Sequence, residues 1–403
     1  MFYPLKIGLI TGEYPPMQGG VGAFTQELAR ALAVLPAAPA LHIMTHRQAR
    51  PPEDAARRSW RQLRDPLDLG FAQLHPHVWR WRWPIMSQIA DWVIRYELDL
   101  VNIQYQAAAY EMYSPAINLL PWRLRPVVPT IVTFHDLRVP YLFPKAGGLR
   151  RRLLNWMARQ ASGVIVTNRS DGEALRQSGL PADGIAQIPI GSNITVHPAP
   201  ATAVAAMRAG WGVSPGQLLL GYFGFLNESK GAELLIQAVA RLDPAVHLVF
   251  IGGRTGSSDS ANNARYLESL DRQIAALGLA ERVHWTDFLP DEQTSICLQA
   301  ADLLVMPYRD GVSLRRGTLM AGLAHGRPLI STAPQTLVSE LVHGRNIWLV
   351  PVDDENGLVA AVQTLQADPT LRARLGAAAA DLSQQFAWDQ IAAQTLAFYD
   401  RFR

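Results

Sequence analysis

KIGLITGEYPPMQGGVGAFTQELARAL, residues 6–32, joins a short apolar segment to a glycine-rich loop and an amphipathic helix. The first six residues form a compact hydrophobic run, which is typical of a strand buried on both faces. The helix predicted over Ala23–Leu35 places Phe24, Leu28 and Leu32 on one face. A strand, a tight loop and a helix in this order are the opening unit of a doubly wound parallel sheet.

The same alternation of strand and helix signals continues along the chain, stops once, and restarts. Apolar strands separated by helices indicate parallel sheets covered on both faces, so we predict an α/β protein with two Rossmann-like doubly wound domains. Strands are expected in the first half at Leu41–Thr45, Leu98–Gln104, Thr130–His135, Gly163–Thr167 and Ala186–Ile190. In the second half they are expected at Leu218–Phe223, Val246–Ile251, Arg282–Trp285, Asp302–Met306, Pro328–Ser331 and Asn346–Val350.

The interruption sets the predicted domain boundaries. An alanine- and proline-rich stretch, 196–216, is interpreted as the linker between a first domain over 1–195 and a second over 217–385. The last segment, 386–403, is expected to form a helix that crosses back onto the first domain. With 403 residues, the chain is long enough for two cores.

Composition narrows the class of protein. No apolar run approaches the roughly 18 residues of a membrane span, and the short apolar run near the N-terminus does not resemble a signal peptide, so we expect a cytoplasmic location. Cys297 is the single cysteine, which excludes an internal disulfide, and it is interpreted as a buried structural thiol. The net charge of +3 is too small to indicate nucleic-acid binding.

The glycine-rich loop is the first candidate site. Gly19, Gly20 and Gly22 allow close approach of the backbone to a ligand just before a helix N-terminus, which suits a phosphate or a sugar hydroxyl. The alternative is a plain tight loop between strand and helix. The spacing is not Gly-x-Gly-x-x-Gly, so the loop does not indicate a dinucleotide.

A second candidate site lies at the start of a helix predicted in the second half of the chain. Ser313 is a candidate N-cap, and Arg315, Arg316, Gly317 and Thr318 place charge and hydrogen-bond donors at the helix start. Such a combination favours an anion. The alternative is a solvated basic helix start.

Two further residues follow predicted strands. Lys230 lies between a strand and a helix, where lysine binds phosphate as a point charge. Only three of the 37 basic residues are lysines, leaving 34 arginines, so a lysine at such a place is informative. His135 ends a hydrophobic strand, where the alternatives are a structural and a functional histidine. The chain has no Asp-x-Asp triplet, which disfavours a metal-dependent phosphate site.

Several stretches of the sequence resemble those of the retaining glycosyltransferases of family 4, which have the GT-B fold. "KIGLITGEYPPMQGGVGAFTQELARAL", "TFHDLR" and "VIVTNRSDGEALRQSGLPADGIAQIPIGSNI" resemble the acceptor domain of that family. "GYFGFLNESKGAELLIQAVARL", "HLVFIGG", "VHWTDFLPDEQTSICLQAADLLVMPY" and "HGRPLIST" resemble its donor domain. The resemblance spans essentially the whole chain and implies two domains that face a central cleft.

The resemblance also implies roles. His135 and Lys230 would be catalytic, with His135 near the transferred sugar and Lys230 on the diphosphate. The donor would further contact the glycine loop at Gly19, Gly20 and Gly22, and Phe225 in the loop that contains Lys230. It would also contact the segment Ser313–Thr318 through Ser313, Arg315, Arg316, Gly317 and Thr318. No cofactor or metal is expected beyond the nucleotide sugar, UDP- or GDP-linked.

The chain departs from the family pattern at three positions. Phe225 stands where the family has an arginine, and Ser313 and Ala321 stand at the places of two glutamates. Arg315 or Arg316 is a hypothetical source of the charge missing at Phe225. The residue that binds ribose is therefore unassigned.

These features predict a metal-independent retaining hexosyltransferase that acts on a glycan, a glycolipid or a small-molecule acceptor. The alternatives are a non-catalytic nucleotide-sugar-binding partner of another enzyme and a sugar-nucleotide epimerase. The aromatic and basic stretch His77–Trp83 is interpreted as a strand with Trp79, Trp81 and Trp83 packed inward. The alternative is peripheral contact with anionic lipid at the inner face of the membrane, with a lipid-linked acceptor.

Overall fold

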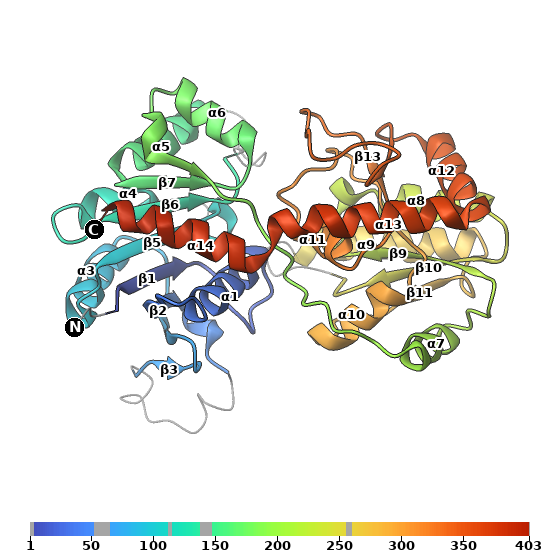
Figure 1. Cartoon of the computed structure of the whole chain (residues 1–403), viewed down its shortest axis with the longest axis horizontal. Helices are drawn as coiled ribbons and strands as arrows, with labels where there is room; N and C mark the ends of the chain where they lie inside the picture. The colour runs from blue at the N-terminus through green and yellow to red at the C-terminus, as the bar shows by residue number, and fades with distance from the viewer. Residues whose placement is uncertain (1–3, 52–64, 112–114, 138–146, 255–259, 403) are drawn as a thin grey trace. The chain divides into compact units, whose positions relative to one another are not determined.

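The chain is divided into two compact units. The computed structural model describes residues 4–51, 65–111, 115–137, 147–254 and 260–402 (Figure 1). The first unit comprises Met1–Ile190 and Trp388–Arg403, and the second comprises Gly191–Ala387. Each unit has its own sheet and its own helices, and the two parallel-sheet α/β units confirm the predicted fold class.

The sheet of the first unit has eight strands in the order β3-β4-β2-β1-β5-β6-β7-β8, parallel except for β3 against β4. The strands are β1 (Lys6–Thr11), β2 (Ala40–His46), β3 (Leu67–Asp68), β4 (Gln73–Val78), β5 (Leu100–Tyr105), β6 (Thr130–Phe134), β7 (Gly163–Val166) and β8 (Ile185–Gln187). The helices are α1 (Gly20–Ala33), α3 (Ile85–Tyr96), α4 (Ala116–Leu124), α5 (Gly147–Gln160), α6 (Arg169–Gln177) and α14 (Trp388–Tyr399). Because the central strands β1, β5 and β6 are almost wholly buried, side chains at their carboxyl ends are held rigidly.

The second unit contains a six-stranded parallel sheet in the order β11-β10-β9-β12-β13-β14. The strands are β9 (Leu218–Phe223), β10 (Val246–Ile251), β11 (Val283–Trp285), β12 (Leu303–Met306), β13 (Leu329–Thr332) and β14 (Trp348–Val350). The helices are α7 (Ala201–Gly210), α8 (Ala232–Arg241), α9 (Ser260–Ala276), α10 (Asp291–Ala300), α11 (Gly317–Ala324), α12 (Glu355–Ala367) and α13 (Pro369–Ser383). The strand order reverses between β9 and β12, and ligands of such sheets bind at this point.

The segment interpreted as a linker contains a helix, α7, over Ala201–Gly210. Within 196–216, helix α7 packs against α10 of the second unit, and Arg208 forms an ion pair with Asp302 at 3.0 Å. Alanine is the strongest helix former, so an alanine-rich run after a proline begins a helix as readily as a linker. The chain passes between the units at 190–191 and 387–388, and α14 packs against α1 of the first unit (Figure 1).

The tryptophan-rich stretch differs from its predicted form. Strand β4 ends at Val78, and of the three tryptophans only Trp81 is buried, whereas Trp79 and Trp83 are 59% and 57% exposed. The prediction that all three pack inward was therefore wrong for two of them. The backbone leaves the strand geometry before Trp79, so the alternation of inward and outward side chains does not apply.

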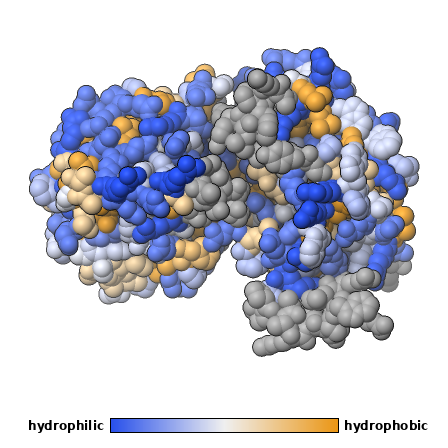
Figure 2. All heavy atoms as spheres, turned by 180° about the vertical axis from the view of Figure 1, so that it is seen from behind, coloured by the Kyte–Doolittle hydropathy of each residue, from blue (hydrophilic) through white to orange (hydrophobic). Residues whose placement is uncertain are grey.

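Two simpler expectations can be compared with the structure directly. Cys297 is fully buried, which confirms the predicted burial, and burial raises the pKa of its thiol to about 12. Among the helices formed by the described residues, none is long and apolar enough to cross a membrane. On the face drawn in Figure 2, hydrophobic residues form small separate patches between hydrophilic ones.

Candidate functional site

The predicted donor residues of the second unit lie on two loops at the reversal point of its sheet. One loop follows β9 and contains the 3-10 helix η6 (Glu228–Lys230), and the other follows β12. The backbone N–H of Arg309 donates to the carbonyl of Ser229 at 3.0 Å, which ties the two loops together. Gly231, which follows η6, has φ +69°, and a Cβ there would lie 2.1 Å from the carbonyl oxygen of Pro307. Only glycine therefore permits this close approach.

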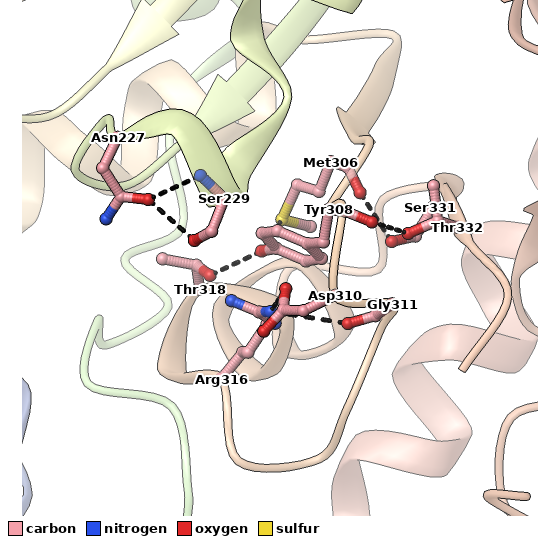
Figure 3. Close-up of polar contacts among 10 residues, drawn as sticks. All are labelled: Asn227, Ser229, Met306, Tyr308, Asp310, Gly311, Arg316, Thr318, Ser331 and Thr332. Carbon is pink, nitrogen blue, oxygen red and sulfur yellow. Dashed lines mark hydrogen bonds and ion pairs between the residues drawn. The ribbon is translucent and has the colours of Figure 1, made fainter. Parts of the chain in front are cut away.

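The ring of Tyr308 contacts both cations of this site, Lys230 and Arg316. Its ring is buried, and its hydroxyl lies 2.9 Å from the Thr318 hydroxyl (Figure 3). The Arg316 guanidinium stacks 3.8 Å from the ring centroid, and the Lys230 ammonium lies 5.4 Å from it. Cation–π contacts of this kind hold positive charge against an aromatic face without neutralising it. Lys230 and Arg316, predicted separately, are thus brought together, and we call Lys230, Tyr308, Asp310, Arg316 and Thr318 the cationic cluster.

Asp310 positions the guanidinium of Arg316. The Asp310 carboxylate forms an ion pair with Arg316 Nη2, which also donates to the carbonyl of Gly311 (Figure 3). Arg316 Nε is buried and has no hydrogen-bond partner in the structure. Nη2 of Arg316 is therefore held by two acceptors, whereas its Nε–H donor is unused.

The charge of Lys230 is poorly compensated. The pKa of Lys230 is lowered to about 7, chiefly by burial and secondly by the nearby Arg316, while Asp310 opposes the shift. A group in this condition gains from an incoming anion, because the anion restores the stability of the charged form. The cluster is consequently suited to a ligand that carries negative charge.

The other residues predicted to bind the donor in this loop lie in a turn or in the first turn of α11. Helix α11 begins at Gly317 with Arg316 as its N-cap, so the prediction of Ser313 as N-cap was wrong. A turn closes from the Arg316 N–H to the carbonyl of Ser313, and helical geometry begins only after that turn. Arg315 is half-buried in the same turn, and Gly317 and Thr318 form the first turn of the helix.

Phe225 and Ala321 mark the departures from the family pattern. Phe225 is half-buried in the loop after β9, while Ala321 is fully buried in α11. Neither offers a polar side chain. Asp310, three positions before Ser313, contributes a carboxylate that forms an ion pair with Arg316, and no role was predicted for it.

In the first unit, the glycine loop holds a carboxylate. Glu13 Oε1 accepts from the backbone N–H groups of Val21 and Gly22, at 3.1 and 3.4 Å, at the start of α1. A Cβ on Gly19 would lie 2.0 Å from the Glu13 carboxylate, whereas nothing lies within 4 Å of one on Gly20. Burial raises the pKa of Glu13. The amides that were expected to meet a phosphate are thus satisfied by an internal anion.

His135 directly follows β6 and ends a chain of buried polar side chains. Its Nε2 lies 2.9 Å from Gln104 Oε1, and Gln104 Nε2 in turn donates to Asn102 Oδ1. The Asn102 amide donates to the Thr133 hydroxyl at 2.9 Å. Because the neighbour of Nε2 is a carbonyl oxygen, Nε2 carries the proton and Nδ1 is the acceptor.

The environment of His135 keeps the imidazole neutral. Burial lowers the pKa of His135 to about 3, and the Phe24 ring contacts the imidazole edge-on at 4.7 Å between centroids. A neutral imidazole whose Nδ1 is an acceptor can take a hydrogen bond from a hydroxyl. Its supporting amides were detectable in the sequence as polar residues within a strand, VNIQY, that is otherwise apolar.

The fold and the cationic cluster define a class: an α/β protein with two parallel-sheet units and a group of positively charged side chains at the reversal point of the second sheet. Residues 19–191 match the model of the glycosyl transferase 4-like domain, and residues 217–368 match that of the glycosyl transferases group 1. The chain belongs to the group 1 glycosyltransferases with the GT-B fold.

Curated relatives match part of their own length. The D-inositol 3-phosphate glycosyltransferase of Stackebrandtia nassauensis is 29% identical over 202 residues, covering 48% of this chain and 44% of the relative. The protein of the same name from Streptomyces scabiei is 28% identical over 250 residues, covering 60% and 54%. The chain thus spans about half the length of the curated relatives it matches.

Solved structures match over nearly the whole chain. Anabaena HepE, solved with UDP and glucose, superposes with a TM-score of 0.74 at 20% identity and covers 98% of this chain and 100% of HepE. The sucrose-phosphate synthase of Thermosynechococcus elongatus has a TM-score of 0.78 at 22% identity, with 98% of each chain covered. At this identity the likeness establishes the GT-B fold.

Proposed function

We propose that this chain is a retaining hexosyltransferase that uses a UDP- or GDP-sugar as donor. The observation that carries the proposal is the cationic cluster, in which Lys230 and Arg316 share the Tyr308 face at the reversal point of the second sheet. A nucleotide diphosphate supplies the anion that this cluster requires. The structure of HepE with UDP and the names of the curated relatives support the same chemistry.

In the proposed mechanism, the second unit stabilises the leaving group. Breaking the bond between the sugar and the diphosphate places new negative charge on the departing phosphate. Lys230, the unused Nε–H of Arg316 and the first amides of α11 are preorganised donors for that charge. One such donor contributes about 3–4 kcal/mol to the transition state.

The first unit is proposed to orient the sugar and to carry the acceptor. The neutral His135 would accept a hydrogen bond from a sugar hydroxyl through Nδ1, held by Gln104. Glu13 already occupies the first amides of α1, so the loop of Gly19, Gly20 and Gly22 is better suited to hydroxyls than to phosphate. Same-face attack, with a phosphate oxygen taking the acceptor proton, would give retention without metal.

The test begins with the donor. Thermal unfolding should be measured with UDP, GDP, ADP and their sugars, because a ligand that binds only the folded state raises the melting temperature. The preferred nucleotide sugar is then incubated with the protein alone and with candidate glycan, glycolipid and small-molecule acceptors. Transfer supports the proposal, and conversion to an epimer without acceptor favours the epimerase. Binding with neither transfer nor hydrolysis favours a non-catalytic partner.

We also propose peripheral contact with anionic membrane at the exposed Trp79 and Trp83. Trp79 is stacked against the Arg47 guanidinium, and Arg80 and Arg82 are exposed beside it. Aromatic rings with neighbouring arginines suit the membrane interface. Co-sedimentation with phosphatidylserine vesicles at low salt should be reduced by Trp79→Ser with Trp83→Ser, while absence of binding by the unmodified protein excludes this contact.

A further inference from the structure

The polar side chains next to His135 lie on one face of the sheet of the first unit. Asn102 and Gln104 are two residues apart on β5. Thr133 lies on β6, and His135 follows two residues later, directly after the strand ends. Residues two apart along a strand point to the same face, and the register pairs Gln104 with Thr133. The His135 N–H donates to the carbonyl of Tyr105 at 3.0 Å, so the strand pairing continues as far as the histidine.

Both ends of the two amide side chains, those of Asn102 and Gln104, are hydrogen-bonded. Gln104 Oε1 lies 2.9 Å from His135 Nε2, and Gln104 Nε2 donates to Asn102 Oδ1. The Thr133 hydroxyl also donates to Asn102 Oδ1, at 3.1 Å, and its oxygen accepts from Asn102 Nδ2 at 2.9 Å. Asn102, Gln104 and Thr133 are all buried, so water does not replace a partner that is lost.

These contacts fix the direction in which the hydrogen bonds run. An amide oxygen only accepts and an amide nitrogen only donates. If either amide turned over by itself, its N–H group would face another N–H group, and buried donors would lose their acceptors. The tautomer of His135 is therefore linked through Gln104 to the orientation of Asn102, which in turn is held by Thr133 of the neighbouring strand.

Aromatic packing restrains the imidazole of His135 on another side. The Phe24 ring of α1 meets the imidazole edge-on, with the centroids 4.7 Å apart. Trp388, at the start of α14, lies 5.2 Å from Phe24 between centroids, and Phe24 is buried. Gln104 at Nε2 and Phe24 at the ring edge together fix the orientation of the imidazole, and therefore the direction in which Nδ1 points.

We propose that Asn102, Gln104 and Thr133 are positioning residues that hold His135 in the tautomer with an acceptor at Nδ1, so that the site selects a ligand that offers a hydroxyl donor. The inference rests on the proposed function, in which that donor is a hydroxyl of the transferred sugar. With the proton on Nδ1 instead, the imidazole would present a donor and would require an acceptor from the ligand. The two strands make this choice before any ligand binds.

The first test observes the tautomer by ¹⁵N NMR of the full chain labelled at histidine, with His135→Gln identifying the signals of His135. These should show the Nε2–H tautomer alone and should not titrate between about pH 5 and pH 8, since the pKa of His135 is lowered to about 3. Gln104→Leu should introduce the second tautomer. The matched control is Asn118→Ala, which removes a buried amide that donates to the Tyr105 hydroxyl, and it should leave the signals unchanged.

Gln104→Glu provides a readout that a merely structural role would not move. The carboxylate favours the imidazolium, so the pKa of His135 should rise. Below the new pKa both ring nitrogens of His135 are donors, whereas above it Nδ1 again accepts. The ratio of the transfer rate of this variant to that of the parent should therefore rise with pH, in step with the titration of His135 followed by NMR.

Rates of transfer separate this proposal from the proposed function. Gln104→Leu should lower kcat about tenfold, as expected for one lost hydrogen bond, and leave KM for the acceptor within about twofold. Thr133→Val, which has nearly the same shape, should give a smaller loss of about threefold, and it replaces Gln104→Leu in both tests if that variant does not fold. A parent protein that shows the expected tautomer but transfers no sugar contradicts the proposed function alone.

Three results would overturn the positioning role. The first is a parent protein in which His135 carries its proton on Nδ1. The second is a folded Gln104→Leu variant that keeps the single Nε2–H tautomer. The third is an active Gln104→Leu variant with the kcat of the parent.

Discussion

The loop after β1 and the loops after β9 and β12 occupy equivalent places in their sheets, yet they carry opposite charge. In the first unit, the amides that open α1 are bonded to the buried carboxylate of Glu13. In the second unit, the start of α11 adjoins Arg316 and, across the Tyr308 ring, Lys230. A glycine-rich loop before a helix is therefore not in itself an anion site. The side chains that surround it determine whether a phosphate can enter.

Gly19 in the loop after β1 and Gly231 in the loop after β9 leave room for different neighbouring groups. Gly19 leaves room for the Glu13 carboxylate, whereas Gly231 leaves room for the carbonyl of Pro307, which brings the loop after β9 against the loop after β12. The first glycine thus accommodates an internal ligand, and the second assembles the cationic cluster. Substitutions on the two sides should separate stability from ligand binding.

The largest expected effect is on Lys230. We expect Lys230→Ala to lower sugar transfer at least about a hundredfold, because it removes a preorganised donor from the developing charge. Lys6→Ala is the matched control, since Lys6 forms an ion pair with the exposed Glu97 in the first unit. Steady-state rates of both variants should be compared with the parent. Near-parental turnover of Lys230→Ala would remove this lysine from the mechanism.

A smaller effect is expected at the neighbouring arginines, which differ in position. Arg316→Ala should weaken nucleotide-diphosphate binding about 10- to 100-fold, since a hydrogen bond to a charged group contributes roughly 1.5–3 kcal/mol. Arg315→Ala should weaken it less, because Arg316 and not Arg315 stacks on Tyr308 beside Lys230. Calorimetric titration of both single variants and of the double variant tests this order. Equal losses in the two single variants would contradict it.

The glycine loop provides a comparison within one unit. Gly19→Ala should destabilise the fold by about 1–3 kcal/mol, because the new methyl group collides with the Glu13 carboxylate. Gly20→Ala, with open space at its Cβ position, should leave stability nearly unchanged. Urea unfolding of both variants measures the difference. If Gly19→Ala recovers stability when combined with Glu13→Ala, the carboxylate is the cause, and if it does not, another contact is responsible.

Much of the fold could be predicted from the sequence because the inner strands are uniformly apolar. The strands β1, β9 and β10 were predicted to the residue, since each is a short apolar run followed by a loop and a helix signal. The edge strand β3 and helix α7 were missed, and the strand expected over His77–Trp83 overlaps only the end of β4, the neighbour of β3. Edge strands alternate less clearly, and α7 has an alanine-rich composition that also suits a linker.

The candidate site was predictable only in part, for a different reason. Lys230 and Arg316 were identified by their types and their places after strands, but Tyr308, Asp310 and Glu13 were not. Their importance comes from contacts across loops, such as the stacking of Arg316 on Tyr308, and no local pattern encodes such a contact. The choice between Arg315 and Arg316 likewise required the geometry of the turn that precedes α11.

The smallest expected effect is a dependence of ligand affinity on pH. Lys230 of the second unit should cause it, and His135 of the first unit should not. With its pKa lowered to about 7 in the free protein, Lys230 must take up a proton when an anionic ligand binds above neutral pH. Affinity for a nucleotide-diphosphate sugar, whose diphosphate does not titrate in this range, should therefore fall about fivefold from pH 7 to pH 8.

The stability of the free protein should change in the opposite direction, because unfolded lysine, with a pKa near 10.5, binds more protons than the folded state between pH 7 and 10.5. Calorimetry in buffers of different ionisation enthalpy measures the proton uptake directly, and Lys230→Ala should abolish it. His135 contributes nothing in this range, since its pKa lies near 3, so any slope that survives in Lys230→Ala would assign the titration to another group.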